Sequence, residues 1–153
     1  MKHLLIVAHT PSPNTKQLAN SAFTGSQNPA IKGVKVVMKT PFKTTINDVL
    51  RANAILLGTT ENLGYMSGAL KDFFDRTYTE ALGKTDGLPY AVYIRAGMDG
   101  TGTKRSIKSI TTGLRWREVQ SPLILKGDWR TKFLLEAKDL GMGLAAGLEA
   151  GVF

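Results

Sequence analysis

The chain has 153 residues and a formal net charge of +8. It contains no cysteine, and this excludes disulfide frameworks, thiolate metal sites and cysteine nucleophiles. This length is enough for one domain with its own core, so we expect residues 1–153 to form a single domain. No apolar run reaches the roughly 18 residues needed to cross a bilayer, and the short run near the start has no signal-peptide cleavage pattern. We therefore expect a cytoplasmic protein that does not contact a membrane.

Apolar segments alternate with stretches of helical periodicity along the chain. Five of these segments are predicted strands: His3–Ala8, Val34–Met38, Ala54–Gly58, Tyr90–Arg95 and Val119–Leu125. Most are continuous runs of Ile, Leu and Val, which is typical of a parallel sheet covered on both faces. The alternation predicts an α/β, doubly wound, five-stranded parallel sheet with the order 2-1-3-4-5, whose ligands bind beyond the carboxyl ends of the strands.

The predicted helices differ in the strength of their patterns. The clearest apolar stripe runs from Leu70 to Ala81, and Ser67 is a good N-cap for that helix. A short helix is predicted after Thr45, whose hydroxyl forms a capping box with Asp48. The last helix, from Phe133 to Leu148, contains three glycines. Each glycine costs about 1 kcal/mol relative to alanine, so the sequence predicts the last turns of that helix less strongly than the rest.

The loop after the first strand is rich in short polar side chains and enters a helix near Thr15. Its candidate ligand-binding residues are Thr10, Ser12, Asn14 and Thr15. A phosphate at this place would meet hydroxyl donors, free amides and the positive end of a helix dipole. The same residues also suit plain helix capping, and that alternative stays open. No glycine lies between Ala8 and Leu18, which excludes a Walker loop and a dinucleotide fingerprint.

The loop after the third strand combines apolar and polar residues. Leu63, Tyr65 and Met66 offer a flat apolar wall for an aromatic ligand. Polar or backbone contacts are expected from the remaining residues of the loop: Thr60, Glu61, Asn62 and Gly64. Large apolar side chains in a loop at a strand end are hard to explain by packing alone, so we expect this loop to bind a ligand.

Two blocks of sequence, AHTPSPNTKQLA and GTTENLGYMSGALKDFFDR, resemble the flavodoxin-like superfamily, and NAD(P)H-dependent FMN reductases in particular. The second block is the more specific, because it matches the family stretch in which Met-Ser-Gly precedes a helix with Lys-Asp-Phe-x-Asp-Arg. The resemblance implies that flavin mononucleotide (FMN) is the cofactor. It places the FMN phosphate at the loop after the first strand and the flavin ring against residues 61–66.

The resemblance also assigns a role to the loop after the fourth strand, which closes over the flavin edge in this family. The matching residues are Ala96, Gly97, Met98 and Asp99. One departure stands in the phosphate loop, where Pro13 replaces the usual glycine and has no amide hydrogen to donate. One phosphate contact is therefore in doubt.

The function implied by this resemblance is an FMN oxidoreductase that takes hydride from NADPH or NADH and passes electrons to a small-molecule acceptor or a redox partner protein. Flavin supplies the chemistry, so no catalytic acid or base is expected, and the two histidines lack the neighbours of a metal site. The alternatives are an electron carrier of the flavodoxin type and a cofactor-free interaction domain. Flavodoxins tend to be acidic, and the basic charge of this chain favours the enzyme. A homodimer is a further implication, since related reductases often dimerise.

Most of the positive charge lies in one segment. Between Lys104 and Lys132 there are eight basic residues and two acidic ones. Such a segment attracts anions, either the phosphates of NADPH or an acidic partner, although a merely solvated face is the plain alternative. We do not expect nucleic acid, because Trp116 and Trp129 lie near the last strand, where tryptophans more often cover a sheet edge than stack on bases.

Overall fold

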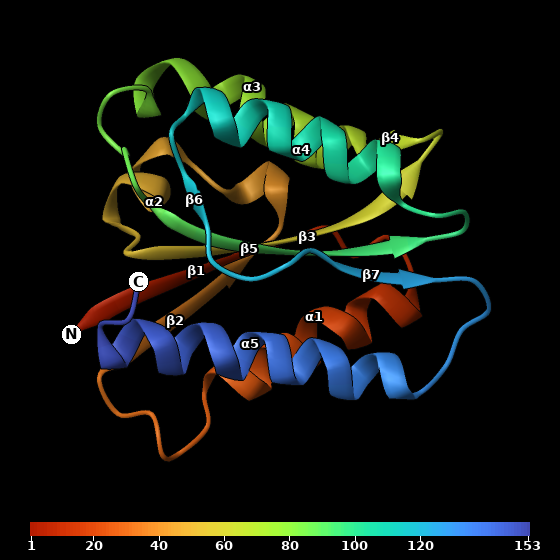
Figure 1. Ribbon diagram of the computed structural model, residues 1–153, viewed down its shortest axis with the longest axis horizontal. Helices are drawn as coiled ribbons and strands as arrows, with labels where there is room; N and C mark the ends of the chain where they lie inside the picture. Colours follow the sequence, from red (N-terminus) through yellow and green to blue (C-terminus); the bar gives the residue numbers. More distant parts are fainter.

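The structure is a computed structural model that describes residues 1–153. A single twisted sheet separates two layers of helices (Figure 1). Its parallel strands follow the order β2-β1-β3-β5-β6. They are β1 (Lys2–Ala8), β2 (Val34–Lys39), β3 (Ala54–Asn62), β5 (Pro89–Ala96) and β6 (Arg117–Glu118). This arrangement confirms the predicted doubly wound α/β fold and its order 2-1-3-4-5.

The fifth predicted strand is divided into two pieces. β6 pairs with Pro89 and Tyr90 at the start of β5, whereas β7 (Leu123–Lys126) pairs with Tyr93 to Ala96 at its end. The prediction of one continuous strand from Val119 to Leu125 is therefore wrong. Pro122 lies between the two pieces and has no amide to continue the ladder.

The helices cover both faces of the sheet (Figure 1). On one face lie α1 (Pro13–Ser26) and α5 (Lys132–Ala150), and on the other lie α2 (Ile46–Arg51), α3 (Gly68–Ala81) and α4 (Thr101–Gly113). Each layer buries its own apolar core against the sheet. None of the helices is long and apolar enough to cross a membrane.

The last helix is complete, including the final turns that its glycines made hardest to predict. α5 continues to Ala150 and packs along α1. Gly141 lies against the backbone of α1, where an added Cβ would overlap the carbonyl oxygen of Ala22. Close packing between the two helices stabilises α5 and offsets the low helix propensity of glycine.

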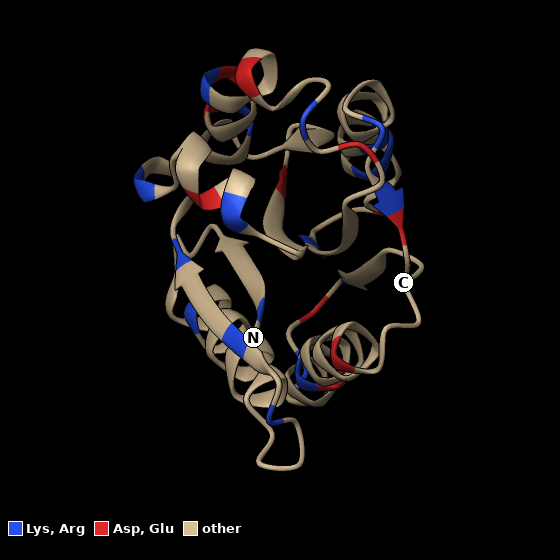
Figure 2. Cartoon of the chain, turned by 90° about the vertical axis from the view of Figure 1, so that its left-hand side faces the viewer, with Lys and Arg blue, Asp and Glu red and all other residues tan.

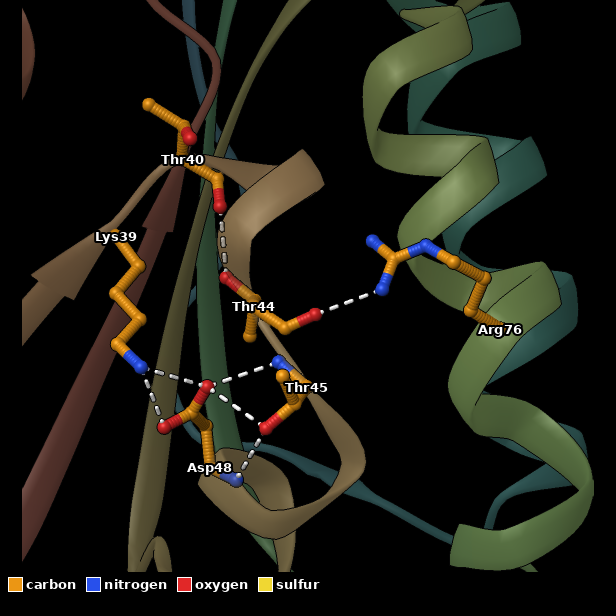
Figure 3. A network of polar contacts seen from close by, with 6 residues as sticks. All are labelled: Lys39, Thr40, Thr44, Thr45, Asp48 and Arg76. Atoms are coloured by element: carbon orange, nitrogen blue, oxygen red, sulfur yellow. Dashed lines mark hydrogen bonds and ion pairs between the residues drawn. The ribbon is translucent and has the colours of Figure 1, made fainter.

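A polar network fixes the short segment between β2 and β3 (Figure 3). Both carboxylate oxygens of Asp48 accept hydrogen bonds from Nζ of Lys39, at 2.9 and 3.0 Å. Asp48 also accepts from the amide of Thr45, whose own hydroxyl accepts from the amide of Asp48, so the predicted capping box of α2 is present. On the other side, Arg76 of α3 donates to the carbonyl of Thr44 at 2.8 Å and to that of Pro41, which belongs to a 3₁₀ turn, η1 (Pro41–Lys43). The network therefore ties α2 to the sheet and to α3.

The Asp48 contacts predict a pH-dependent contribution to stability. Partial burial alone would raise the pKa of Asp48, but hydrogen bonds from Lys39 and Thr45 lower it below its ordinary value. A lowered folded-state pKa means that the stabilisation is complete above the unfolded pKa of about 3.9 and is lost as the pH falls through the folded pKa. Asp48→Asn should therefore lower the free energy of unfolding by about 1 kcal/mol at pH 7, with the difference shrinking towards pH 2.

Urea unfolding of both proteins across this pH range provides the measurement. Asp75→Asn is the matched control, because Asp75 forms an exposed pair with Lys71 on α3 and should change stability much less. A constant Asp48→Asn effect from pH 7 to pH 2 would contradict the assignment.

Candidate functional site

The segments singled out by the sequence lie at one edge of the sheet. Figure 1 shows that β1, β3, β5 and β7 point their carboxyl ends towards the same side, where α1, α4 and α5 begin. This is the edge at which ligands bind in doubly wound sheets. The three predicted binding loops therefore share one edge.

The loop after β1 closes on itself through a capping box. Ser12 is the N-cap of α1, and its hydroxyl accepts from the amide of Thr15 at 3.2 Å while Oγ1 of Thr15 accepts from the amide of Ser12 at 3.0 Å. α1 therefore begins at Pro13, earlier than the predicted start near Thr15. Proline suits this first helical position, because its missing amide hydrogen would have no partner inside the helix.

Because the capping box engages Ser12 and Thr15, the side chains of other residues in this loop are the ones free to bind a ligand. Thr15 is buried, whereas Thr10 is half-buried and Asn14 is exposed, and neither of these two side chains has a hydrogen-bond partner in the protein. Burial lowers the pKa of His9 and so disfavours the charged form of its imidazole. A phosphate bound at this loop would meet neutral side-chain donors and the positive end of α1.

The predicted loop after β3 is largely a β-hairpin. β3 continues to Asn62, well beyond the predicted end at Gly58, and returns as β4 (Tyr65–Met66). The extension occurs because Thr59 and Thr60 keep pairing with β5, and threonine favours extended backbone. Only Leu63 and Gly64 form the turn.

This turn holds a leucine in a backbone conformation that leucine rarely adopts. Leu63 has φ 52° and Gly64 has φ 72°, as a type I′ turn requires. Asn and Gly are preferred at such positions, and an L-residue with a larger side chain is strained there by about 1 kcal/mol or more. The Leu63 side chain is fully exposed, so nothing in the fold compensates for the strain.

Replacing Leu63 tests the strain directly. Leu63→Asn should raise the free energy of unfolding by about 1 kcal/mol, as measured by chemical denaturation. Leu135→Asn is the control, because Leu135 is an exposed leucine within α5 and asparagine has the lower helix propensity there. A loss of stability in Leu63→Asn would contradict the strain argument.

Glu61 ties the hairpin to the loop between β5 and α4. Its Oε1 accepts from the amide of Met98 and its Oε2 from the amide of Gly100, both at 2.8 Å. Asp99 lies in the same loop, and its carboxylate accepts hydrogen bonds from the amide and the hydroxyl of Thr101. These hydrogen bonds lower the pKa of Asp99. Two carboxylates therefore fix the loop that was predicted to close over the flavin.

The start of α4 holds the hairpin from the other side. Thr103 donates its hydroxyl hydrogen to the carbonyl of Tyr65 at 2.9 Å, and the hydroxyl of Ser106 accepts from the amide of Met66 at 3.3 Å. Gly102 allows the contact, because a Cβ there would overlap the carbonyl oxygen of Gly64. These supports were not predicted from the sequence, although the spacing of Thr103 and Ser106 places both on one helix face.

The predicted site residues divide into exposed and buried groups. Three apolar side chains are exposed at this edge: Leu63, Tyr65 (41%) and Met98 (76%). Gly97, Asn62 and Gly64 are exposed too, and Thr60 donates its hydroxyl hydrogen to Oδ1 of Asn62 at 2.8 Å. The side chains of Thr15, Met66 and Ala96 are buried and support the site from below.

The surface hollows near this edge are bordered by only some of the predicted site residues. One of about 130 Å³ lies between α1 and β2 and is bordered by Thr10, Lys16 and Asn20, among others. A broader one of about 630 Å³ lies over α4. Neither spans all three loops, so a planar ligand would rest on the exposed side chains of an open edge.

Comparison with known proteins finds similarity to flavodoxins in sequence and in fold. Over 114 residues, 74% of this chain, the sequence is 30% identical to a flavodoxin from Aquifex aeolicus, of whose length the match covers 60%. A flavodoxin from the domain Archaea superposes with a TM-score of 0.79 at 22% identity, covering 97% of this chain and 99% of the other. Megasphaera elsdenii flavodoxin gives 0.76 at 19% identity, with 94% and 98% covered. No family model matches the chain.

These comparisons correct the predicted activity. The expectation of an NAD(P)H-dependent enzyme is wrong, because the curated relative and the solved structures just described are flavodoxins and none is a reductase. The comparisons therefore give no support for NADPH or NADH as the reductant. The basic charge that favoured the enzyme in the sequence therefore needs another explanation.

Proposed function

We propose, from the flavodoxin-like fold of this chain, that it binds FMN at the carboxyl edge of its sheet and carries electrons between redox proteins without a reductase activity of its own. The observation that carries the proposal is the group of exposed apolar side chains at that edge, Leu63, Tyr65 and Met98, held together through Glu61. Such side chains suit one face of a flavin ring. We include a cytoplasmic location in the proposal.

The residues of the structure fit this cofactor. Thr10 and Asn14 offer free side-chain donors to a phosphate, and the first turn of α1 contains no acidic residue that would repel it. Pro13 removes one amide from the phosphate loop, and the amides of Ser12 and Thr15 are engaged in the capping box. The proposed phosphate contact therefore depends mainly on the side chains of Thr10 and Asn14. When bound, FMN would supply the electron storage that no side chain here provides.

Reconstitution with FMN is the first test of this proposal. Purified protein mixed with FMN should retain the yellow colour and visible absorption band of flavin after gel filtration. The band should bleach on adding dithionite or a partner reductase and should persist on adding NADPH. Protein that stays colourless after mixing with FMN would overturn the assignment and leave a cofactor-free interaction domain.

The phosphate assignment has its own test. Thr10→Val together with Asn14→Ala removes both free donors and leaves the Ser12–Thr15 capping box intact. FMN binding should weaken at least tenfold while riboflavin, which has no phosphate, binds as before. Asn47→Ala on α2 is the control, since Asn47 is exposed away from this edge. Equal losses for FMN and riboflavin would contradict a phosphate contact at this loop.

A further inference from the structure

The helices that begin at the site edge share an unusual charge pattern. None of α1, α3, α4 and α5 has an acidic residue in its first turn. Acidic residues are normally favoured there because they offset the positive end of the helix dipole. In α2, by contrast, Asp48 fills that role. The ends of α1, α3 and α5 therefore keep their positive potential, whereas the start of α4 is partly offset by Glu61 and Asp99, which accept from the amides of Gly100 and Thr101.

Basic side chains add to this potential along α4. Figure 2 shows Lys and Arg gathered on α4 and β6 at one corner of the molecule. Lys104 and Arg105 are exposed and form no ion pair, whereas Lys108 pairs with Glu118 at 2.8 Å. The hollow over α4 is lined only by polar and basic residues: Thr101, Lys104, Arg105, Lys108, Ser109 and Thr112. Lys104 also borders a second hollow of about 440 Å³ beside Gln120 and Ser121.

This surface is continuous with the proposed cofactor edge. α4 follows directly after the loop that carries Met98, and its first turn packs against the hairpin that carries Leu63. A protein bound over Lys104 and Arg105 would therefore also reach the exposed apolar side chains. An apolar centre beside a charged rim is the usual composition of a protein interface.

We propose that the surface formed by Lys104, Arg105 and Lys108, with Met98 at its border, docks the acidic face of a redox partner protein. The proposal rests on the proposed function, and it explains why this chain is basic: the protein attracts partners of the opposite charge. A protein fits better than a nucleic acid, because Tyr65 is the one exposed aromatic side chain nearby and both tryptophans are engaged within the protein. Trp116 is buried and donates to Thr85, and Trp129 packs edge-on against Phe133.

The test reverses two charges without risk to the fold. Lys104→Glu with Arg105→Glu changes two exposed, unpaired side chains near the start of α4, where negative charge is favourable. The control, Lys35→Glu with Arg51→Glu, makes the same change in net charge at exposed residues of β2 and α2, near the opposite edge of the sheet. The probe is immobilised cytochrome b5, whose surface is acidic, and association is followed by surface plasmon resonance.

The α4 variant should associate with cytochrome b5 at least tenfold more slowly than the wild type at low ionic strength, and the control no more than about threefold. The difference should vanish at an ionic strength of about 0.5 M, where charges are screened within a few ångströms. Equal losses in both variants, or no binding of the probe, would overturn the proposal. Duplex DNA that displaces the probe and binds the wild type more tightly than the probe does would overturn it in favour of nucleic acid.

Titration of the same samples with FMN separates this proposal from the proposed function. Uptake of FMN by both variants together with an unchanged association rate would reject the docking surface and leave the electron carrier intact. Failure of every sample to bind FMN, with the selective loss of association still present, would reject the carrier and leave the docking surface.

Discussion

Gly141→Ala should lower the free energy of unfolding by about 3 kcal/mol or more, as measured by urea or thermal denaturation. Gly141 is buried where α5 crosses α1, and a Cβ there would overlap the carbonyl oxygen of Ala22. The obstacle is backbone, which cannot turn aside as a flexible side chain can. The two helices would have to separate, and both bury apolar side chains against the same face of the sheet.

The same substitution two residues further along provides the control. Gly143 lies in the same helix, but a Cβ there meets only the end of the Gln120 side chain, at 3.3 Å. Because alanine favours the helix by about 1 kcal/mol, Gly143→Ala should leave stability unchanged or raise it. If Gly141→Ala proved no more harmful than Gly143→Ala, the close contact between α1 and α5 would be wrong.

Glu61→Gln should weaken FMN binding at least tenfold and lower the free energy of unfolding by about 1–2 kcal/mol. Both carboxylate oxygens accept hydrogen bonds from amides of the β5–α4 loop. An amide side chain has one acceptor only, so its NH₂ group would face a backbone N–H donor. The loop with Met98 would then lose its fixed position beside the hairpin. Fluorescence titration with FMN and urea unfolding measure the two effects.

Glu80→Gln is the matched control for Glu61, because Glu80 is exposed on α3 and makes no ion pair. Glu80→Gln should change neither the affinity for FMN nor the free energy of unfolding. An FMN affinity that is unchanged in Glu61→Gln would mean that the β5–α4 loop takes no part in binding, even if stability fell as expected.

The fold was predictable because the central strands have clear apolar patterns in their own residues. Continuous Ile, Leu and Val in β1 and β3 predict burial on both faces, and Ser67 and Thr45 predict where α3 and α2 begin. The completeness of α5 was not predictable from helix propensity. It depends on the contact between Gly141 and α1, which joins residues far apart in the sequence.

The convergence of the three candidate loops at one edge of the sheet was predictable, but the hydrogen bonds between them were not. The sequence placed Glu61 in a ligand-binding loop, but its partners Met98 and Gly100 follow another strand, and no local pattern connects them. The hairpin was not predicted because Leu63 occupies the first turn position, where Asn is the residue that usually indicates a type I′ turn. Charge alone misled the functional prediction, since a positive surface does not distinguish a nucleotide phosphate from an acidic protein.

The division of the outermost strand also bears on self-association. A long unbroken strand at the border of a sheet offers free amides and carbonyls on which another molecule can build. Here β6 and β7 are short, with Pro122 between them, while the opposite border strand, β2, carries Lys35 and Lys39. Both borders therefore discourage the growth of a sheet shared between copies of this chain.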